Sequence, residues 1–313
     1  MQIRVSAVQY HLHTIHSFDD FANQVVHYIK TAKEFNSDFI VFPEFFTTQL
    51  MSIGNEDGKA LTIQDLPKFT EQYRSLFIKL AKETGMHIIG GTHVIGKEDK
   101  LYNVAHLFYP DGRVAQQAKL HITPTELHEW NMSAGEGLEV FKTDKGTIAM
   151  LTCYDIEFPE VVRIAKAKGA DIIFCPSCTD DQHGFHRVRY TSHARAIENQ
   201  VYVVTTGTVG SLPTVDFMRG NFGQAVVITP NDVPFPPRGI LVEGEINQDM
   251  IVTADLNLEL LYKVRESGSV TTWRDRRSDL YPDWEDEKYT KSEERQCIEK
   301  SFMFSTTGSQ SQQ

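Results

Sequence analysis

The chain has 313 residues, of which 41% are hydrophobic and 23% charged, a balance typical of an ordinary globular protein. Its formal charge of −11 argues against a nucleic acid as partner, because a polyanion needs a basic binding face. The sequence contains no apolar run of about 18 residues or more, so we expect no membrane-spanning helix.

The N-terminus and the cysteines indicate the compartment. The first residues, MQIRVSAVQY, alternate like a strand and lack the charged and apolar segments of a signal peptide. Four cysteines (Cys153, Cys175, Cys178 and Cys297) are too few for a disulfide framework in a chain of this length. We therefore expect a cytoplasmic protein with reduced thiols. Cys175 and Cys178 end an apolar run, where cysteine is usually a small core residue rather than a metal ligand.

Strand and helix patterns alternate along the chain. Strands are predicted at 2–9, 38–44, 87–94, 146–153, 170–177 and 201–209, with a strand pair around a PDG turn in 102–119 and further strands in 224–234 and 240–257. Helices are predicted from Ser17, over 67–84, from Pro159 to Lys168 and over 186–199. Since no low-complexity linker interrupts this order, we expect one α/β domain over residues 1–281. Residues 282–313 turn charged and then Ser/Gln-rich, which predicts an arm with a disordered tip.

Three reactive side chains each follow the end of a strand-like run. Glu44 comes after DFIVFP, Lys119 after RVAQQA and Cys153 after TIAMLT. In open α/β sheets the carboxyl ends of the strands are where sites collect, so we expect the three to lie together. A thiol needs a base or a cation to become a nucleophile, and an ammonium also stabilises an oxyanion. The N–H of Tyr154, at the start of the structure after the thiol, is a further candidate oxyanion donor.

The motifs FPEFF, KLHITPTE and CYDIEFPE, in this order, resemble the signatures of the carbon–nitrogen hydrolase (nitrilase) superfamily. The similarity continues through HARAIENQVYVVTTG and ESGSVTTWRDRRSDLY and so covers residues 2–281. The resemblance implies a four-layer α-β-β-α sandwich that associates into homodimers and uses no cofactor or metal. It also implies that Glu44 is the general base, Lys119 the oxyanion-stabilising lysine and Cys153 the nucleophile.

The family also uses a second glutamate between the lysine and the cysteine. KLHITPTELHEW resembles the form in which this glutamate lies seven residues after the lysine and four before a tryptophan. This favours Glu126, with Trp130 following, while Glu129 stays open as the alternative. The loop at 207–222 carries Gly and Pro and is expected to help wall the pocket.

The segment after the cysteine separates branches of the superfamily. CYDIEFPE is closer to the amidase form C-x-D-x-x-F-P-E than to the nitrilase form, in which Trp-Glu follows the cysteine. The resemblance therefore implies a hydrolase of small non-peptide amides acting through a cysteine thioester, with Tyr154 and Glu157 as further pocket residues. Nitriles or N-carbamoyl amides as substrates, and a non-catalytic family member, are the alternatives.

Overall fold

A computed structural model describes residues 1–54 and 58–281. Met1–Trp273 form one compact unit, and a second unit starts at Arg274. Of the second unit, residues 274–281 are described and contain a turn in which the N–H of Leu280 donates to the carbonyl of Arg277. The arm predicted for residues 282–313, with Cys297, lies outside the described residues.

The strands of the first unit belong to one hydrogen-bonded sheet, whose central path runs β5-β4-β3-β2-β1-β9-β8-β7-β6. In addition β12 pairs with β1, and β10 pairs with β9 and β11. The strands are β1 (Gln2–Leu12), β2 (Phe39–Val41), β3 (His87–Lys97), β4 (Lys100–Phe108), β5 (Val114–Ala118), β6 (Phe141–Thr143), β7 (Gly146–Met150), β8 (Ile172–Ser177), β9 (Tyr202–Gly210), β10 (Val226–Ile228), β11 (Ile240–Glu243) and β12 (Met250–Asn257).

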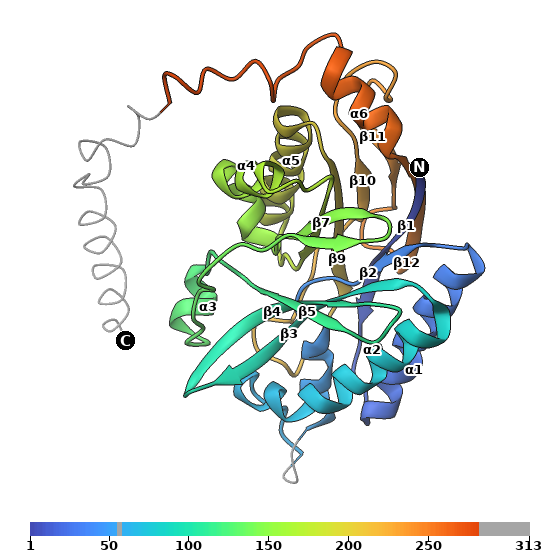
Figure 1. The fold of residues 1–313 in the computed structure, drawn as a ribbon. Helices are drawn as coiled ribbons and strands as arrows, with labels where there is room; N and C mark the ends of the chain where they lie inside the picture. The colour runs from blue at the N-terminus through green and yellow to red at the C-terminus, as the bar shows by residue number, and fades with distance from the viewer. Residues whose placement is uncertain (55–57, 282–313) are drawn as a thin grey trace, which may run out of the picture. The chain divides into compact units, whose positions relative to one another are not determined.

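The helices flank this sheet. They are α1 (Phe18–Glu34), α2 (Thr70–Thr84), α3 (Pro124–His128), α4 (Pro159–Ala167), α5 (Gln182–Asn199) and α6 (Leu258–Ser267), with 3-10 helices η1 (Phe46–Ile53), η2 (Ile63–Phe69) and η3 (Cys153–Glu157). Figure 1 shows α1 and α2 on one side of the strands and α4 and α5 on the other.

The sheet doubles over at the contact between β1 and β9. Most of β1 pairs with β12 and β2, and only Gln9–Leu12 at its end pairs with Gly207–Gly210 of β9. The strands on either side of this contact form two layers, and their inner side chains share one apolar core. Two further cores lie between these layers and the helices. The predicted α-β-β-α sandwich is therefore confirmed.

Alternation of side chains along each strand builds these three cores. In β2, Phe39 and Val41 enter the core between the two layers, while Ile40 packs with the core under α1 and α2. In β8, Ile172 enters the same central core and Ile173 packs with the core under α4 and α5. Because neighbouring residues in a strand point to opposite faces, a strand buried on both sides reads as a continuous apolar run.

Helix boundaries follow their capping residues. Ser17 caps α1 by accepting a hydrogen bond from the N–H of Asp20, and Gly85 ends α2 with a left-handed backbone, both as predicted. The helix predicted over 67–84 begins only at Thr70, because η2 is a separate capped turn. The helix predicted from residue 186 begins at Gln182, because Asp181 accepts from the N–H of Gly184 and caps it there.

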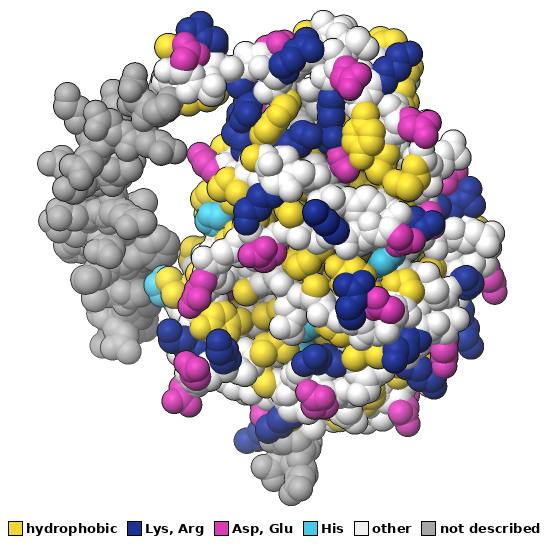
Figure 2. All heavy atoms as spheres, in the orientation of Figure 1, with side chains coloured by type: hydrophobic (Ala, Val, Ile, Leu, Met, Phe, Trp, Pro, Cys, Tyr) yellow, Lys and Arg dark blue, Asp and Glu magenta, His cyan; other side chains and the backbone are white. Residues whose placement is uncertain are grey.

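In the part of the chain that the structure describes, no helix is long and apolar enough to cross a membrane. On the face drawn in Figure 2, acidic and basic side chains lie interspersed.

Candidate active site

The structure brings the predicted Glu44, Lys119 and Cys153 into one cavity of about 550 Å³. The three residues follow β2, β5 and β7, and they are 1%, 2% and 7% exposed. Glu126, on the short helix α3, lines the same cavity and is 2% exposed. Glu129, the alternative second glutamate, is exposed and does not line the cavity.

Lys119 connects the two buried carboxylates. Its Nζ donates to Oε1 of Glu44 at 2.8 Å and to Oε2 of Glu126 at 2.7 Å. The carboxylate of Glu126 also accepts from the backbone N–H and the hydroxyl of Thr123, each at 2.9 Å, which caps α3. The orientation of α3 therefore turns Glu126 toward the lysine and leaves Glu129 in solvent.

The two carboxylates differ in their electrostatics. Burial raises the pKa of Glu44, and the attraction of Lys119 offsets this only in part. For Glu126, burial also raises the pKa, but the charge of Lys119 and its hydrogen bonds prevail and leave the pKa below the ordinary value. When two neighbouring carboxyls have their pKa values pushed apart, they suit different roles. Glu44 is the one suited to exchange a proton, and Glu126 the one suited to remain ionised.

The lysine and the thiol are shifted by the same surroundings. Burial lowers the pKa of Lys119, but Glu44 and Glu126 together raise it well above the ordinary value, so the ammonium is charged. Burial raises the pKa of Cys153, and the charge of Glu44 raises it further, against the opposing effect of Lys119. The resting site therefore holds a protonated thiol, which would need a base to act as a nucleophile.

The turn that carries Cys153 is strained and is tied to the loop after Lys119. Cys153 has φ of 47°, a left-handed conformation that costs energy for a residue with a side chain. Asp155, two residues on, accepts from the N–H groups of Leu120 at 3.1 Å and His121 at 2.8 Å, and from the N–H of Thr152 at 3.1 Å. Asp155 thus ties the loop after Lys119 to the turn that carries the thiol.

Arg195 of α5 supports the same turn from the other side. Its Nε donates to the carbonyl of Ile156 at 2.9 Å, and its Nη2 donates to the carbonyl of Glu157 at 2.6 Å. Its Nη1 also donates to Glu198 at 3.2 Å, within the same helix. The guanidinium satisfies carbonyls at the end of η3, where a short helix leaves them without internal partners.

The segment after β2 is fixed by the neighbouring strand β3. The residue that follows Glu44, Phe45, also has a left-handed backbone with φ of 53°, and its N–H donates to Oγ1 of Thr92 at 2.9 Å. Gly91 (φ 60°) makes this close approach possible, since a Cβ there would lie 2.1 Å from the carbonyl oxygen of Pro43. The backbone N–H of Cys178 completes the support by donating to Oε2 of Glu44 at 3.0 Å.

The cavity has an aromatic wall and a charged wall. The ring of Trp130 lies 5.1 Å from that of Phe45 and 5.9 Å from that of Phe217, centroid to centroid. Phe217 belongs to the loop 207–222, so the prediction that this loop helps wall the pocket is confirmed. The charged wall consists of Glu157, Asp180 and Arg187.

A family comparison supports the assignment of this cavity. The family model described as carbon-nitrogen hydrolase matches residues 4–266. The chain belongs to the carbon–nitrogen hydrolase family. The match contains β2, β5 and β7 and therefore every residue of the cavity.

Relatives of this carbon–nitrogen hydrolase include a probable hydrolase, YhcX, of Bacillus subtilis, which is 48% identical over 279 residues. That alignment covers 89% of this chain and 54% of YhcX, so the chain spans about half the length of that relative. A 2-oxoglutaramate amidase of Bacillus subtilis is 29% identical over 79% of this chain and 87% of its own length. An omega-amidase of Xenopus tropicalis is 26% identical over 90% and 97% of the two chains.

Solved structures share the fold. A carbon–nitrogen hydrolase from Helicobacter pylori superposes with a TM-score of 0.75 at 21% identity, covering 91% of this chain and 98% of that one. Nit3 of Saccharomyces cerevisiae, described as a member of the nitrilase superfamily, gives a TM-score of 0.71 at 23% identity, covering 88% and 97%.

Three residues of the carbon–nitrogen hydrolase site have roles that the sequence did not indicate. Asp155 stood out only as part of the amidase-like segment, and Arg195 only as the partner of Glu198, a pair that the structure confirms. Asn103 was not recognised, although it contacts both buried carboxylates. The one available signal was a polar side chain inside the otherwise apolar strand segment YNVAHLF.

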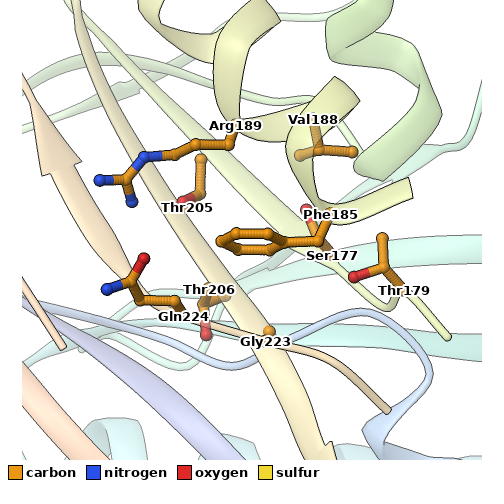
Figure 3. Close-up of a pocket in the computed structure, with 10 residues that line it drawn as sticks. Ser177, Thr179, Phe185, Val188, Arg189, Thr205, Thr206, Gly223 and Gln224 are labelled. Carbon is orange, nitrogen blue, oxygen red and sulfur yellow. The ribbon is translucent and has the colours of Figure 1, made fainter. Parts of the chain in front are cut away.

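A second, much smaller cavity lies beside the first and shares Thr179 and Val188 with it. Its volume of about 10 Å³ suits a single water molecule. Figure 3 shows the ring of Phe185 between Thr205 and Thr206 at this cavity, with the side chain of Arg189 extending past Thr205. Arg189 is bound to Glu243 at 2.5 Å through Nη2, while its buried Nη1 has no hydrogen-bond partner among the described residues.

Proposed function

We propose that this chain hydrolyses the carbon–nitrogen bond of a small, non-peptide amide through a thioester on Cys153. The observation that carries the proposal is the buried Glu44–Lys119–Glu126 cluster in the cavity that the thiol lines. The relatives named 2-oxoglutaramate amidase and omega-amidase support amides as the substrates. The reacting groups lie deep in a cavity of about 550 Å³, which suits a small molecule better than a folded protein substrate.

In the first half of the reaction, the Glu44 carboxylate takes the thiol proton as Sγ of Cys153 bonds to the amide carbon. The carbonyl oxygen becomes an oxyanion, which the ammonium of Lys119 and the N–H of Tyr154 stabilise. Lys119 has three N–H donors, and Glu44 and Glu126 accept from two of them, which leaves one for the substrate. As the intermediate collapses, the carbon–nitrogen bond breaks, the nitrogen takes the proton from Glu44, and a thioester remains.

In the second half, Glu44 takes a proton from a water molecule as that water attacks the thioester carbon. The second tetrahedral intermediate collapses, Cys153 leaves as a thiolate and recovers its proton from Glu44, and the acid product departs. Glu126 stays ionised throughout and keeps Lys119 charged and oriented. Acyl transfer through a thioester has no redox step, so the reaction needs no electron-transferring cofactor.

The charged residues of the cavity wall indicate which substrate charge the site favours. Four acidic and two basic side chains line the cavity, so acidic groups outnumber basic ones there. Glu157 is 16% exposed, and its partner Arg187, at 3.4 Å, is 61% exposed. The acid of this pair is therefore the deeper group, and burial raises its pKa although Arg187 opposes this. We infer that neutral or cationic amides are preferred over amides that carry a carboxylate, in contrast to the 2-oxoglutaramate for which one relative is named.

Ammonia release from four compounds tests both parts of the proposal: butanamide, 4-aminobutanamide, succinamate and butyronitrile. We expect hydrolysis of the neutral and cationic amides, and kcat/KM lower by about tenfold for succinamate because of repulsion by Glu157. The E157Q variant is expected to reduce the difference in kcat/KM between the neutral amide and succinamate. No ammonia from any amide would contradict the amidase function. A preference for succinamate would contradict only the charge assignment, and turnover of the nitrile alone would indicate a nitrilase.

Paired glutamate variants test the assignment of the second glutamate. The E126Q variant removes a charge that holds Lys119, so we expect kcat to fall by about 10²-fold or more. The E129Q variant changes an exposed side chain outside the cavity and is expected to keep the parent kcat. Steady-state kinetics on butanamide measures both. A large loss in E129Q with little change in E126Q would reverse the assignment.

A further inference from the structure

Asn103 contacts all three charged residues at the base of the cavity. It lies in β4 and is fully buried. Its Nδ2 donates to Oε1 of Glu44 at 2.8 Å and to Oε1 of Glu126 at 2.9 Å. Its backbone carbonyl accepts from the N–H of Lys119 at 2.8 Å. One residue therefore links both carboxylates to the strand end from which the lysine extends.

The chemistry of the neighbours fixes the orientation of the amide. Both side-chain contacts are carboxylate oxygens that accept hydrogen bonds, so the amide nitrogen must face them. The opposite atom, Oδ1, is buried and has no hydrogen-bond partner among the described residues. An unpaired buried acceptor costs stability. The side chain therefore donates to both carboxylates while its own oxygen is left without a hydrogen bond.

A neutral donor has a specific effect between two carboxylates. Each N–H of the amide stabilises the ionised form of one carboxylate, and the amide adds no charge. Without it, Lys119 would be the only group that bonds to both carboxylates, since the N–H of Cys178 supports Glu44 alone and Thr123 supports Glu126 alone. The other titratable groups around Glu44 are the thiols of Cys153, Cys175 and Cys178, and Lys119 and Glu126 complete its surroundings.

We propose that Asn103 is a positioning residue for the proposed amidase, and that its amide keeps Glu44 in the charged, proton-accepting form and fixes both carboxylates around Lys119. This inference rests on the proposed function, but its test does not depend on turnover alone. Asn103 acts through Glu44 and Glu126 rather than on the substrate.

The test replaces Asn103 by Ala and, to keep the volume filled, by Leu. Losing a donor to the ionised Glu44 raises the pKa of that carboxyl, so the acid limb of the pH profile of kcat/KM is expected to move to higher pH in both variants. At neutral pH we expect kcat/KM on butanamide to fall by about 10- to 100-fold. If Asn103 had only a structural role, its loss would lower the maximal kcat/KM without moving the acid limb of the pH profile to higher pH.

Asn199 provides a matched control. It is also a fully buried asparagine whose Oδ1 has no partner in the described part of the chain, but its Nδ2 donates to the carbonyl of Arg195 and to Oε1 of Glu198, both in α5 and outside the cavity. The N199A variant is expected to lose thermal stability, read as a lower Tm, without a shift of the acid limb. The comparison separates the loss of a buried amide from the loss of this particular pair of hydrogen bonds.

A second readout uses the thiol itself. The rate at which iodoacetamide alkylates Cys153, followed by mass spectrometry of the peptide that carries Cys153 over a range of pH, reports the base that activates the thiol. We expect the increase of the alkylation rate with pH to occur at higher pH in N103A and N103L and at the parent pH in N199A. This readout remains available if no amide is turned over, so failure of the amidase function and failure of this inference are distinguishable. Folded N103A and N103L proteins with unshifted alkylation and kinetic profiles would overturn it.

Discussion

Replacing Cys153 by alanine is expected to abolish amide hydrolysis, with kcat falling by about 10⁴-fold or more. The variant has no sulfur to form the thioester, so the two-step reaction cannot begin. Ammonia release measures the loss. Intact mass under rapid quenching is expected to show an acyl adduct on the parent protein and none on C153A.

The C175A variant is the matched control. Cys175 is fully buried in β8 and belongs to the core under α4 and α5. Its thiol contacts the hydroxyl of Ser177 and the backbone of Cys153 but does not line the cavity. We expect C175A to keep its kcat and to form the same acyl adduct. An adduct on C153A, or loss of the adduct in C175A, would contradict the assignment of the nucleophile.

The strand ends of this site could be predicted from the sequence because they follow from local patterns. A buried strand reads as an apolar run, and the first reactive residue after it lies at the carboxyl edge of the sheet. Glu44 and Cys153 follow such runs, whereas Lys119 follows the half-exposed edge strand β5 and is indicated by its place at a strand end and by the motif KLHITPTE. The sequence did not predict the helix α6, because β12 runs directly into it. Asn257 ends the strand and caps the helix, so no turn residue separates the strand pattern from the helix pattern.

The arrangement of charged groups in the site and their pKa shifts could not be predicted in the same way. Whether Glu126 or Glu129 faces the lysine depends on how α3 is turned, and its cap at Thr123 sets that orientation. The opposite pKa shifts of Glu44 and Glu126 arise from burial and from donors on distant segments. Asn103 is one such donor, 59 residues from Glu44 along the chain. Such pairings depend on the register of β3, β4 and β5, which one sequence does not specify.

The K119M variant is expected to lose activity and stability together. Methionine keeps much of the volume of the side chain but leaves Glu44 and Glu126 buried without their cation. Removing one partner of a buried ion pair costs about 3–5 kcal/mol, so we expect a loss of that order in the free energy of unfolding near neutral pH. Hydrolysis of butanamide is expected to fall to the level of C153A, because the oxyanion and both carboxylates lose the same ammonium.

The pH dependence of stability distinguishes this cause from simple loss of packing. In the parent protein Lys119 lowers the pKa of Glu126, so the contribution of Glu126 is present above its unfolded pKa and is lost as pH falls through the folded value. The raised pKa of Glu44 acts oppositely, with a contribution lost as pH rises. In K119M both carboxyls are expected to have raised pKa values, so the variant should be most stable at acidic pH and weaken as pH rises through them.

Urea unfolding of the parent and K119M at pH 5 and pH 8 tests this, with K145M as the matched control. Lys145 pairs with Asp38 at 2.8 Å, but its side chain is 34% exposed, so we expect a change of about 1 kcal/mol or less. The deficit of K119M relative to the parent is expected to be larger at pH 8 than at pH 5, because burying two ionised carboxylates without a cation is costly only while they are ionised. An equal loss in the free energy of unfolding at pH 5 and pH 8 would mean that Lys119 stabilises the fold by packing rather than by compensating the charges of Glu44 and Glu126.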